Sequence, residues 1–165
     1  MRPSFPAVAL PHAVPMLEQR NPRLDFLALG LLAAVAFLGA AVLSYDPADP
    51  PSTLVWPERT EIGNLCGRSG AVVSATLFAG LGVGAYYLLA SLAILDGLLL
   101  ARREVHSPWL RLVGWLFSLV GVCTLSGMAY PGSSPGSVIG AGGYLGAAGK
   151  GVLQAYFAAA GSYIV

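Results

Sequence analysis

The chain has 165 residues, of which 56% are hydrophobic and only 10% are charged, and its mean hydropathy is +0.70. Soluble domains carry roughly a quarter of charged residues, so the composition excludes an ordinary soluble domain and predicts a membrane protein. The net charge of +1 excludes the basic field that a nucleic-acid partner would need, so we expect no direct nucleic-acid binding by this segment.

The first 23 residues contain several prolines and only short apolar patches. This segment lacks the continuous apolar region of a cleavable signal peptide, and the prolines prevent a helix throughout. We therefore expect residues 1–23 to form a disordered cytoplasmic tail, with the first hydrophobic helix acting as an uncleaved signal anchor.

Three long runs with few charges follow the tail. An α-helix needs roughly 20 apolar residues to cross a hydrocarbon core of about 30 Å. The runs predict membrane-spanning helices over about residues 24–45, 70–101 and 109–130, and the second is long enough to be tilted. Pro108 suits the first helical turn of the third span, where Trp109 and Trp115 are available as interfacial anchors.

The region after Pro131 is rich in glycine and carries Lys150 near its middle. A lysine at the bilayer centre costs about 3 kcal/mol, so we expect an interfacial or re-entrant helix over residues 138–159. The start of a truncated fourth span is expected at 161–165, which makes the chain a fragment by this interpretation. The alternative is one helix over residues 138–165 in which the lysine extends its ammonium group to the surface. The prediction is an all-α, polytopic membrane bundle within residues 24–165.

Orientation follows from the arginines that flank the predicted spans. The loop over residues 46–69 has more acidic than basic residues. Because cytoplasmic loops are enriched in Lys and Arg, we predict a cytoplasmic N-terminus and an external first loop. The six arginines on the predicted cytoplasmic side are Arg2, Arg20, Arg23, Arg102, Arg103 and Arg111.

The sequence predicts no catalytic, cofactor-binding or metal-binding residue. The glycine-rich region contains Gly149-Lys150, but Gly151 follows where a phosphate-binding loop has Ser or Thr, and the preceding glycine spacing is wrong. Both histidines lie outside the spans, which leaves serines and cysteines there without a base. Cys66 and Cys123 lack the spacing of a zinc or redox site, and the role of the Cys66 thiol stays open.

Small residues at four-residue spacing favour close helix contacts in lipid. The alternative interpretation is that glycine is simply common in membrane helices. Asp96 in the second predicted span is expected to be a shallow, interfacial carboxylate close to Arg102 and Arg103. The glycines predicted to pack helices together are Gly80, Gly84, Gly142, Gly143 and Gly146.

The loop between the first two spans opens with SYDPADP and closes with NLCGRSGA, and a GGYLG segment occurs later. These phrases, in this order between spans, resemble the four-helix N-terminal membrane domain of the FtsK/SpoIIIE family of DNA translocases. The Asp-Pro pairs are expected to form a rigid turn, because proline fixes φ and aspartate accepts local N–H groups. The residues that carry the resemblance in the loop are Ser44, Tyr45, Asp46, Pro47, Asp49, Pro50, Asn64, Gly67 and Gly70.

The resemblance implies a multi-pass protein of the bacterial cytoplasmic (inner) membrane that anchors a cytoplasmic hexameric ATPase at the division septum. It also implies a homo-oligomer and contacts with other division proteins, besides the lipid bilayer. The motor domain is not part of this chain, which is therefore not expected to be an enzyme. The alternative is a small membrane transporter or channel subunit, which would require buried charges or a broken helix along a path.

Overall fold

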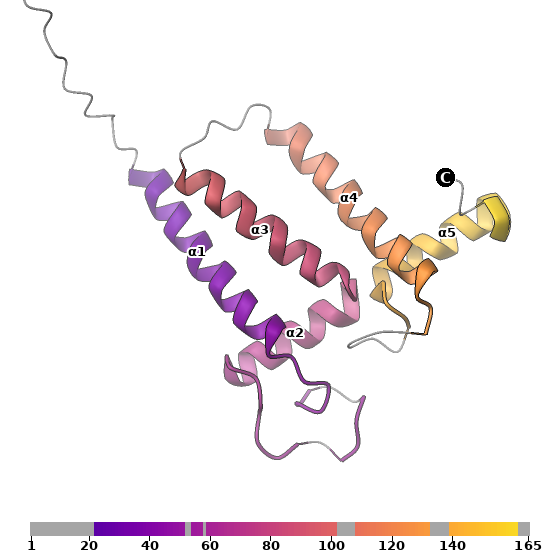
Figure 1. The fold of residues 1–165 in the computed structure, drawn as a ribbon, viewed down its shortest axis with the longest axis horizontal. Coiled ribbons are helices and arrows are strands. Elements are labelled where there is room, and N and C mark those ends of the chain that lie inside the picture. Colours follow the sequence, from indigo (N-terminus) through magenta and orange to yellow (C-terminus); the bar gives the residue numbers. More distant parts are fainter. Residues whose placement is uncertain (1–21, 52–53, 58, 102–107, 133–138, 162–165) are drawn as a thin grey trace, which may run out of the picture.

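The structure is a computed structural model that describes residues 22–51, 54–57, 59–101, 108–132 and 139–161 (Figure 1). Within these ranges the chain forms five helices and no strand, which confirms the predicted all-α, polytopic class. Residues 1–21, most of the predicted tail, lie outside the described residues. The helices are α1 (Pro22–Leu43), α2 (Gly67–Leu81), α3 (Gly84–Leu100), α4 (Pro108–Ala129) and α5 (Gly143–Gly161).

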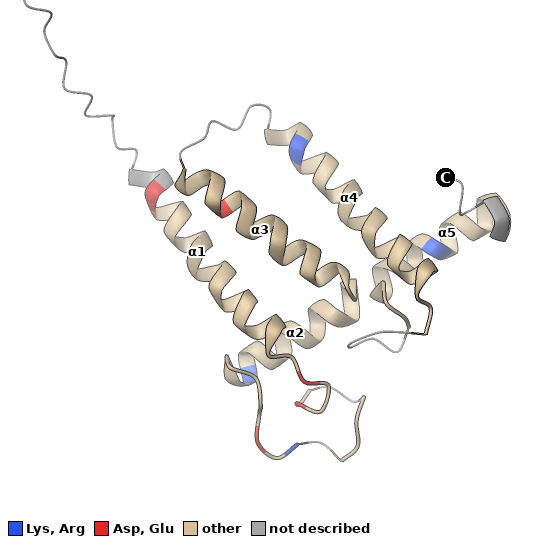
Figure 2. Cartoon of the chain, viewed as in Figure 1, with Lys and Arg blue, Asp and Glu red and all other residues tan. Residues whose placement is uncertain are grey.

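Helices α1 and α4 are long and apolar enough to cross a membrane on their own. Their bounds lie within two residues of the predicted spans. Charged side chains are sparse along both helices (Figure 2). Large apolar side chains such as Phe26 and Phe117 point away from the protein with about three quarters of their surface exposed. In a membrane protein such side chains face lipid, so the exposed surfaces of α1 and α4 are suited to contact with lipid acyl chains.

The prediction of one continuous helix over residues 70–101 is wrong. Helices α2 and α3 are separated at Gly82 and Val83, and their axes differ by 112°. Gly82 has a φ of +58°, which glycine adopts without steric cost. The Val83 N–H donates to Ala141 O at 2.7 Å, a partner outside its own helix. The chain therefore turns sharply because a positive-φ glycine and a distant backbone acceptor stabilise the break.

A small core joins three helices at the end of α1. Val42, Phe78 and Ala85 are buried together, one from each of the first three helices. The Phe78 ring lies 4.6 Å from the ring of Tyr45 and 5.4 Å from that of Tyr86, measured between centroids. Helix α3 runs back along α1, while α5 packs most extensively on α4 and also contacts α2 (Figure 1).

Helix α5 differs from the expected helix over residues 138–159 at both ends. It begins at Gly143, after a turn, and continues through Gly161 without the break expected there. Residues 133–138 and 162–165 lie outside the described residues, so the expected fourth span does too. Half-buried Lys150 lies in α5, which is not among the helices apolar enough to cross a membrane alone.

Asp96 is buried inside the protein, with only 3% of its surface exposed, and its expected neighbours Arg102 and Arg103 lie outside the described residues. It follows Leu89 by two helical turns and so lies on the same face of α3. A methyl group on Gly39 of α1 would meet the Leu89 side chain at 3.9 Å, which places this face against α1. Among the described residues, Oδ1 of Asp96 is buried without a hydrogen-bond partner.

We expect the substitution Asp96→Leu to raise the free energy of unfolding by about 1–3 kcal/mol, because it removes a buried oxygen whose hydrogen bonding is unsatisfied. Thermal unfolding of the purified chain in one detergent measures the change. Asp96→Asn is the control, since it keeps a polar group in the same place and should give no such gain. A lower stability of Asp96→Leu than of Asp96→Asn would contradict the expectation.

Candidate functional site

A buried carboxylate joins the two ends of the loop between α1 and α2. Asp49 is only 2% exposed, and its Oδ1 accepts a hydrogen bond from the Gly63 N–H at 2.9 Å. Its Oδ2 accepts one from the Asn64 N–H, also at 2.9 Å. A carboxylate that accepts two backbone N–H groups forms charge-assisted hydrogen bonds, which are stronger than neutral ones. Asp49 therefore holds the end of the loop, at Gly63 and Asn64, against the beginning of the loop.

Asn64 connects the loop to both helices. Its Nδ2 donates to Ala41 O at 2.9 Å, which satisfies a carbonyl of the last turn of α1. Its Oδ1 accepts from the Cys66 N–H at 3.0 Å, immediately before α2 begins. The amide thus uses its donor on α1 and its acceptor at the start of α2, a combination that neither Asp nor Leu could reproduce.

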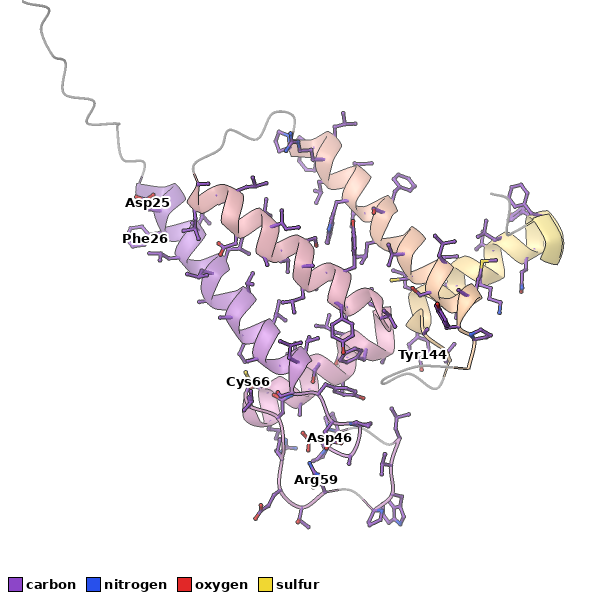
Figure 3. All side chains as sticks on the ribbon, in the orientation of Figure 1. Asp25, Phe26, Asp46, Arg59, Cys66 and Tyr144 are labelled. Carbon is purple, nitrogen blue, oxygen red and sulfur yellow. The ribbon has the colours of Figure 1, made fainter. Side chains whose placement is uncertain are left out.

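Ser44 and Asp46 complete the network on the α1 side. The Ser44 hydroxyl donates to Ala40 O at 2.5 Å and accepts from the Leu65 N–H at 3.0 Å. Asp46 Oδ1 accepts from the Ala48 N–H at 2.9 Å, as expected for a turn begun by aspartate. Its Oδ2 accepts from Arg59 Nη1 at 2.8 Å, and Figure 3 shows these two side chains facing each other in the loop.

The glycines of the motif make room for this network. Gly67 has a φ of +62°, and its N–H donates to Asn64 O at 2.8 Å. A methyl group on Gly70 would overlap Asn64 Oδ1 and the Cys66 side chain. The structure thus brings Asn64 and both glycines together at the start of α2, while Tyr45 contributes its ring to the core.

The network presents an exposed apolar tip. The tip consists of Leu54, Val55 and Trp56 in the middle of the loop, and Trp56 is 88% exposed. Pro47 and Pro50 follow the two aspartates and restrict φ at the beginning of the loop. We call residues 44–66 the loop cap, and residues 54–56 its apolar tip. The sequence motif identified the residues at the base of the loop cap but not its tip or Arg59. Neither the apolar residues of the tip nor Arg59 belong to the motif.

The Arg59–Asp46 ion pair should contribute little to stability. The two side chains are 51% and 33% exposed, so water screens their attraction. We expect Arg59→Ala to change the free energy of unfolding by at most about 1 kcal/mol. Thermal unfolding at low and high salt checks this, and a loss of several kcal/mol would mean that the pair is essential to the loop cap.

A second cluster, which we call the glycine junction, lies where the α2–α3 turn meets α4 and α5. Methyl groups on Gly82 and Gly84 would overlap Ala141 O and Cys123 Sγ, respectively. Gly143 has a φ of +62°, and a methyl group there would approach the carbonyl of Gly80 at 2.7 Å. The absence of these side chains allows the turn and the start of α5 to touch through their backbones.

The junction continues between α4 and α5. Methyl groups on Gly142 and Gly146 would both overlap Cys123 O, and one on Gly149 would overlap the Thr124 hydroxyl. The three glycines follow each other at spacings of four and three residues, which places them on one face. Sequence reasoning missed Gly149, although the continued spacing could have revealed it.

The close helix contact predicted through Gly80 and Gly84 is present at Gly84 but not through the side-chain position of Gly80. A methyl group on Gly80 would meet no atom within 4 Å, whereas Gly84 lies against α4. The two glycines belong to different helices because the chain turns between them. Gly82, which the four-residue spacing passes over, makes the close contact instead.

Within the described ranges, no group of three or more His, Cys, Asp or Glu side chains could hold a metal ion. The carboxylates and the amide of the loop cap accept and donate hydrogen bonds within the loop or to the helix ends. The geometry therefore serves to shape an exposed loop and to lock helices together.

The chain is similar in sequence to one family of known proteins. The family described as the 4TM region of DNA translocase FtsK/SpoIIIE matches residues 22–165. The DNA translocases FtsK of Pseudomonas syringae pv. syringae (strain B728a) and of pv. tomato (strain ATCC BAA-871 / DC3000) are each 36% identical to the chain over 129 residues. The matches cover 76% of this chain and 15% of each curated relative. No solved structure matches the chain significantly. The chain thus belongs to the FtsK/SpoIIIE family of DNA translocases, through the 4TM region of that family.

Proposed function

We propose that this chain is the membrane-anchoring and protein-interaction domain of a bacterial division DNA translocase. It lies in the cytoplasmic membrane with its N-terminus inside and the loop cap outside. The family match supports the anchoring role, since the matched region is named for its transmembrane helices. The chain itself is not an enzyme, and the motor activity belongs to a part of the protein outside this segment.

The observation that carries the interaction role is the exposed apolar tip of a loop whose base is held by hydrogen bonds. Asp49 and Asn64 fix the base of the loop cap, so the tip loses less conformational entropy when a partner binds. Trp56 is 88% exposed, and tryptophan is enriched among the residues that dominate binding energy at interfaces. We propose that other division proteins bind this tip on the outer side of the membrane.

A fluorescent fusion of the chain, expressed in Pseudomonas syringae, tests this role. We expect enrichment at the division septum, and a loss of that enrichment in Trp56→Ala with membrane localisation retained. Trp109→Ala is the matched control, because Trp109 is 79% exposed but lies on the spanning helix α4. An equal septal signal for Trp56→Ala and Trp109→Ala would refute a role of the tip.

Thiol labelling tests the orientation. Thr60 is exposed in the loop cap, and residue 104 belongs to the segment between α3 and α4. In a Cys66→Ser background, we expect an impermeant maleimide to label Thr60→Cys in intact cells, and Glu104→Cys only after permeabilisation. The reverse pattern would place the N-terminus outside.

The purified chain in nanodiscs should hydrolyse no ATP above a Lys150→Ala control. Phosphoryl transfer requires backbone amides around the phosphates together with a hydroxyl group on magnesium, and the Gly149-Lys150-Gly151 segment offers no such hydroxyl. Magnesium-dependent turnover that is lost in Lys150→Ala would contradict the non-enzymatic role. A salt-dependent shift of duplex DNA would contradict the absence of nucleic-acid binding.

The transporter alternative gains two features, the broken helix at Gly82 and the buried Asp96. The break, however, is filled by protein, because Gly82 lies against Ala141 and Gly84 against Cys123. Asp96 is 12 residues beyond Gly84, which is about 18 Å along α3. The two features are thus far apart and do not favour a shared path, so we retain the anchoring role.

A further inference from the structure

Helix α2 lies across the end of α1 and not alongside it. Near the start of α2, Gly70 touches Asn64, whose Nδ2 donates to Ala41 O at 2.9 Å. Eight residues further along α2, Phe78 is packed in one cluster with Val42. Both parts of α2 therefore lie near the end of α1, the first of them through the Asn64 side chain.

A helix that ran along α1 would behave differently. Eight residues advance a helix by about 12 Å, so Phe78 would lie opposite a residue more than two turns from Val42. Helix α3 does run along α1, because Ala85 is packed with Val42 and Leu89 lies opposite Gly39. Helix α3, and not α2, therefore runs alongside α1.

The angle at the break leads to the same geometry. It is 112°, which is 22° beyond a right angle. If α3 stands perpendicular to the membrane, the 15 residues of α2 extend about 22 Å but change depth by only about 8 Å. Helix α3, with 17 residues, extends about 26 Å, close to the thickness of about 30 Å that a span must cross.

One face of α2 is buried against the protein, and the opposite face is exposed. Gly70, Ala71, Ser74 and Phe78 are buried against the protein. Arg68, Val72 and Thr76 are exposed at four-residue spacing on the other side, and we call them the exposed strip of α2. The Thr76 hydroxyl donates to Val72 O at 2.8 Å, so it does not require water as a partner.

We propose that α2 lies flat in the outer membrane interface, with its exposed strip among the lipid headgroups, and that α3 crosses the bilayer alone. Arg68 at the start of the strip would pair with headgroup phosphate, as guanidinium groups do. The side of the membrane on which α2 lies rests on the proposed orientation, but its flat position does not.

Spin-label depth measurements test this proposal. A nitroxide is attached to single cysteines at positions 68, 72 or 76 in α2, in a background with Cys66→Ser and Cys123→Ala. The chain is reconstituted into vesicles of phosphatidylethanolamine and phosphatidylglycerol, and depth is read from collisions with oxygen and with a water-soluble nickel complex. Leu29, Ala36 and Leu43 are the matched positions on α1, since they are exposed at regular spacing on a helix that crosses.

We expect the α1 labels to show a deep position between two shallow ones, and the three α2 labels to be shallow and to differ in depth by only about 4 Å. A depth that increases by about 12 Å from position 68 to position 76 would mean that α2 crosses the membrane and would overturn the proposal. Equal but deep positions would also overturn it. An inverted orientation would leave the expected profile unchanged, so failure of the proposed topology is distinguished by the thiol labelling described above.

Discussion

The variant Asn64→Ala should lose about 2–4 kcal/mol of its free energy of unfolding, one of the largest effects expected for a single substitution in this chain. The side chain is buried and bonded at both ends, to Ala41 O and to the Cys66 N–H. Its removal leaves these two backbone groups without their partner and also loosens the contact with Gly70. Thermal unfolding in detergent measures the loss, and faster proteolysis of the loop cap should accompany it.

Two further variants separate the contributions. Asn64→Asp keeps the acceptor for the Cys66 N–H but loses the donor to Ala41 O, so we expect an intermediate loss. Thr60→Ala is the control in the same loop, because Thr60 is exposed. An Asn64→Ala protein as stable as Thr60→Ala would mean that the hydrogen-bonded loop cap does not stabilise the fold.

The variant Gly146→Leu should lose about 3 kcal/mol or more, because any side chain at this position overlaps the backbone carbonyl of Cys123. A backbone atom cannot move aside by a simple rotation, as a flexible side chain could, so α4 and α5 must separate. Thermal unfolding in detergent and thiol accessibility of Cys123 both report the separation.

Gly151→Leu is the matched control on the same helix. A methyl group there would meet no atom within 4 Å. Leucine is also the better helix former, so we expect no loss of stability for this variant. If both substitutions in α5 had the same effect, close packing at the glycine junction would not be what holds α5 on α4.

Sequence reasoning predicted the spans α1 and α4 well, because their apolar runs are long. In addition, no tertiary contact breaks the backbone of either helix. Sequence reasoning failed at Gly82, since hydropathy over residues 70–101 does not register backbone conformation. The break depends on the hydrogen bond from Val83 to Ala141 O, a residue far along the chain. No local pattern could have indicated that partner.

The candidate site divides in the same way. The resemblance in the loop identified Asp49 and Asn64 as members of one group, but not that a carboxylate of one accepts the N–H of the other. The small-residue spacing identified Gly84 and Gly146 but also Gly80, where an added methyl group would meet no atom within 4 Å. Spacing indicates which residues share a helix face, while only the fold decides which face has a neighbour.

The bond between Val83 and Ala141 has a consequence for biosynthesis. Ala141 is made 58 residues after Val83, which takes about 3–12 s at ribosomal rates of about 5–20 residues per second. In that interval the Val83 N–H lacks its native acceptor and needs another one, since a backbone N–H removed from water without a partner is costly. A continuous nascent helix would supply it through the carbonyl of Ala79. We therefore expect the second hydrophobic segment to leave the ribosome as one straight helix and to bend only when the glycines of the last helix arrive beside it.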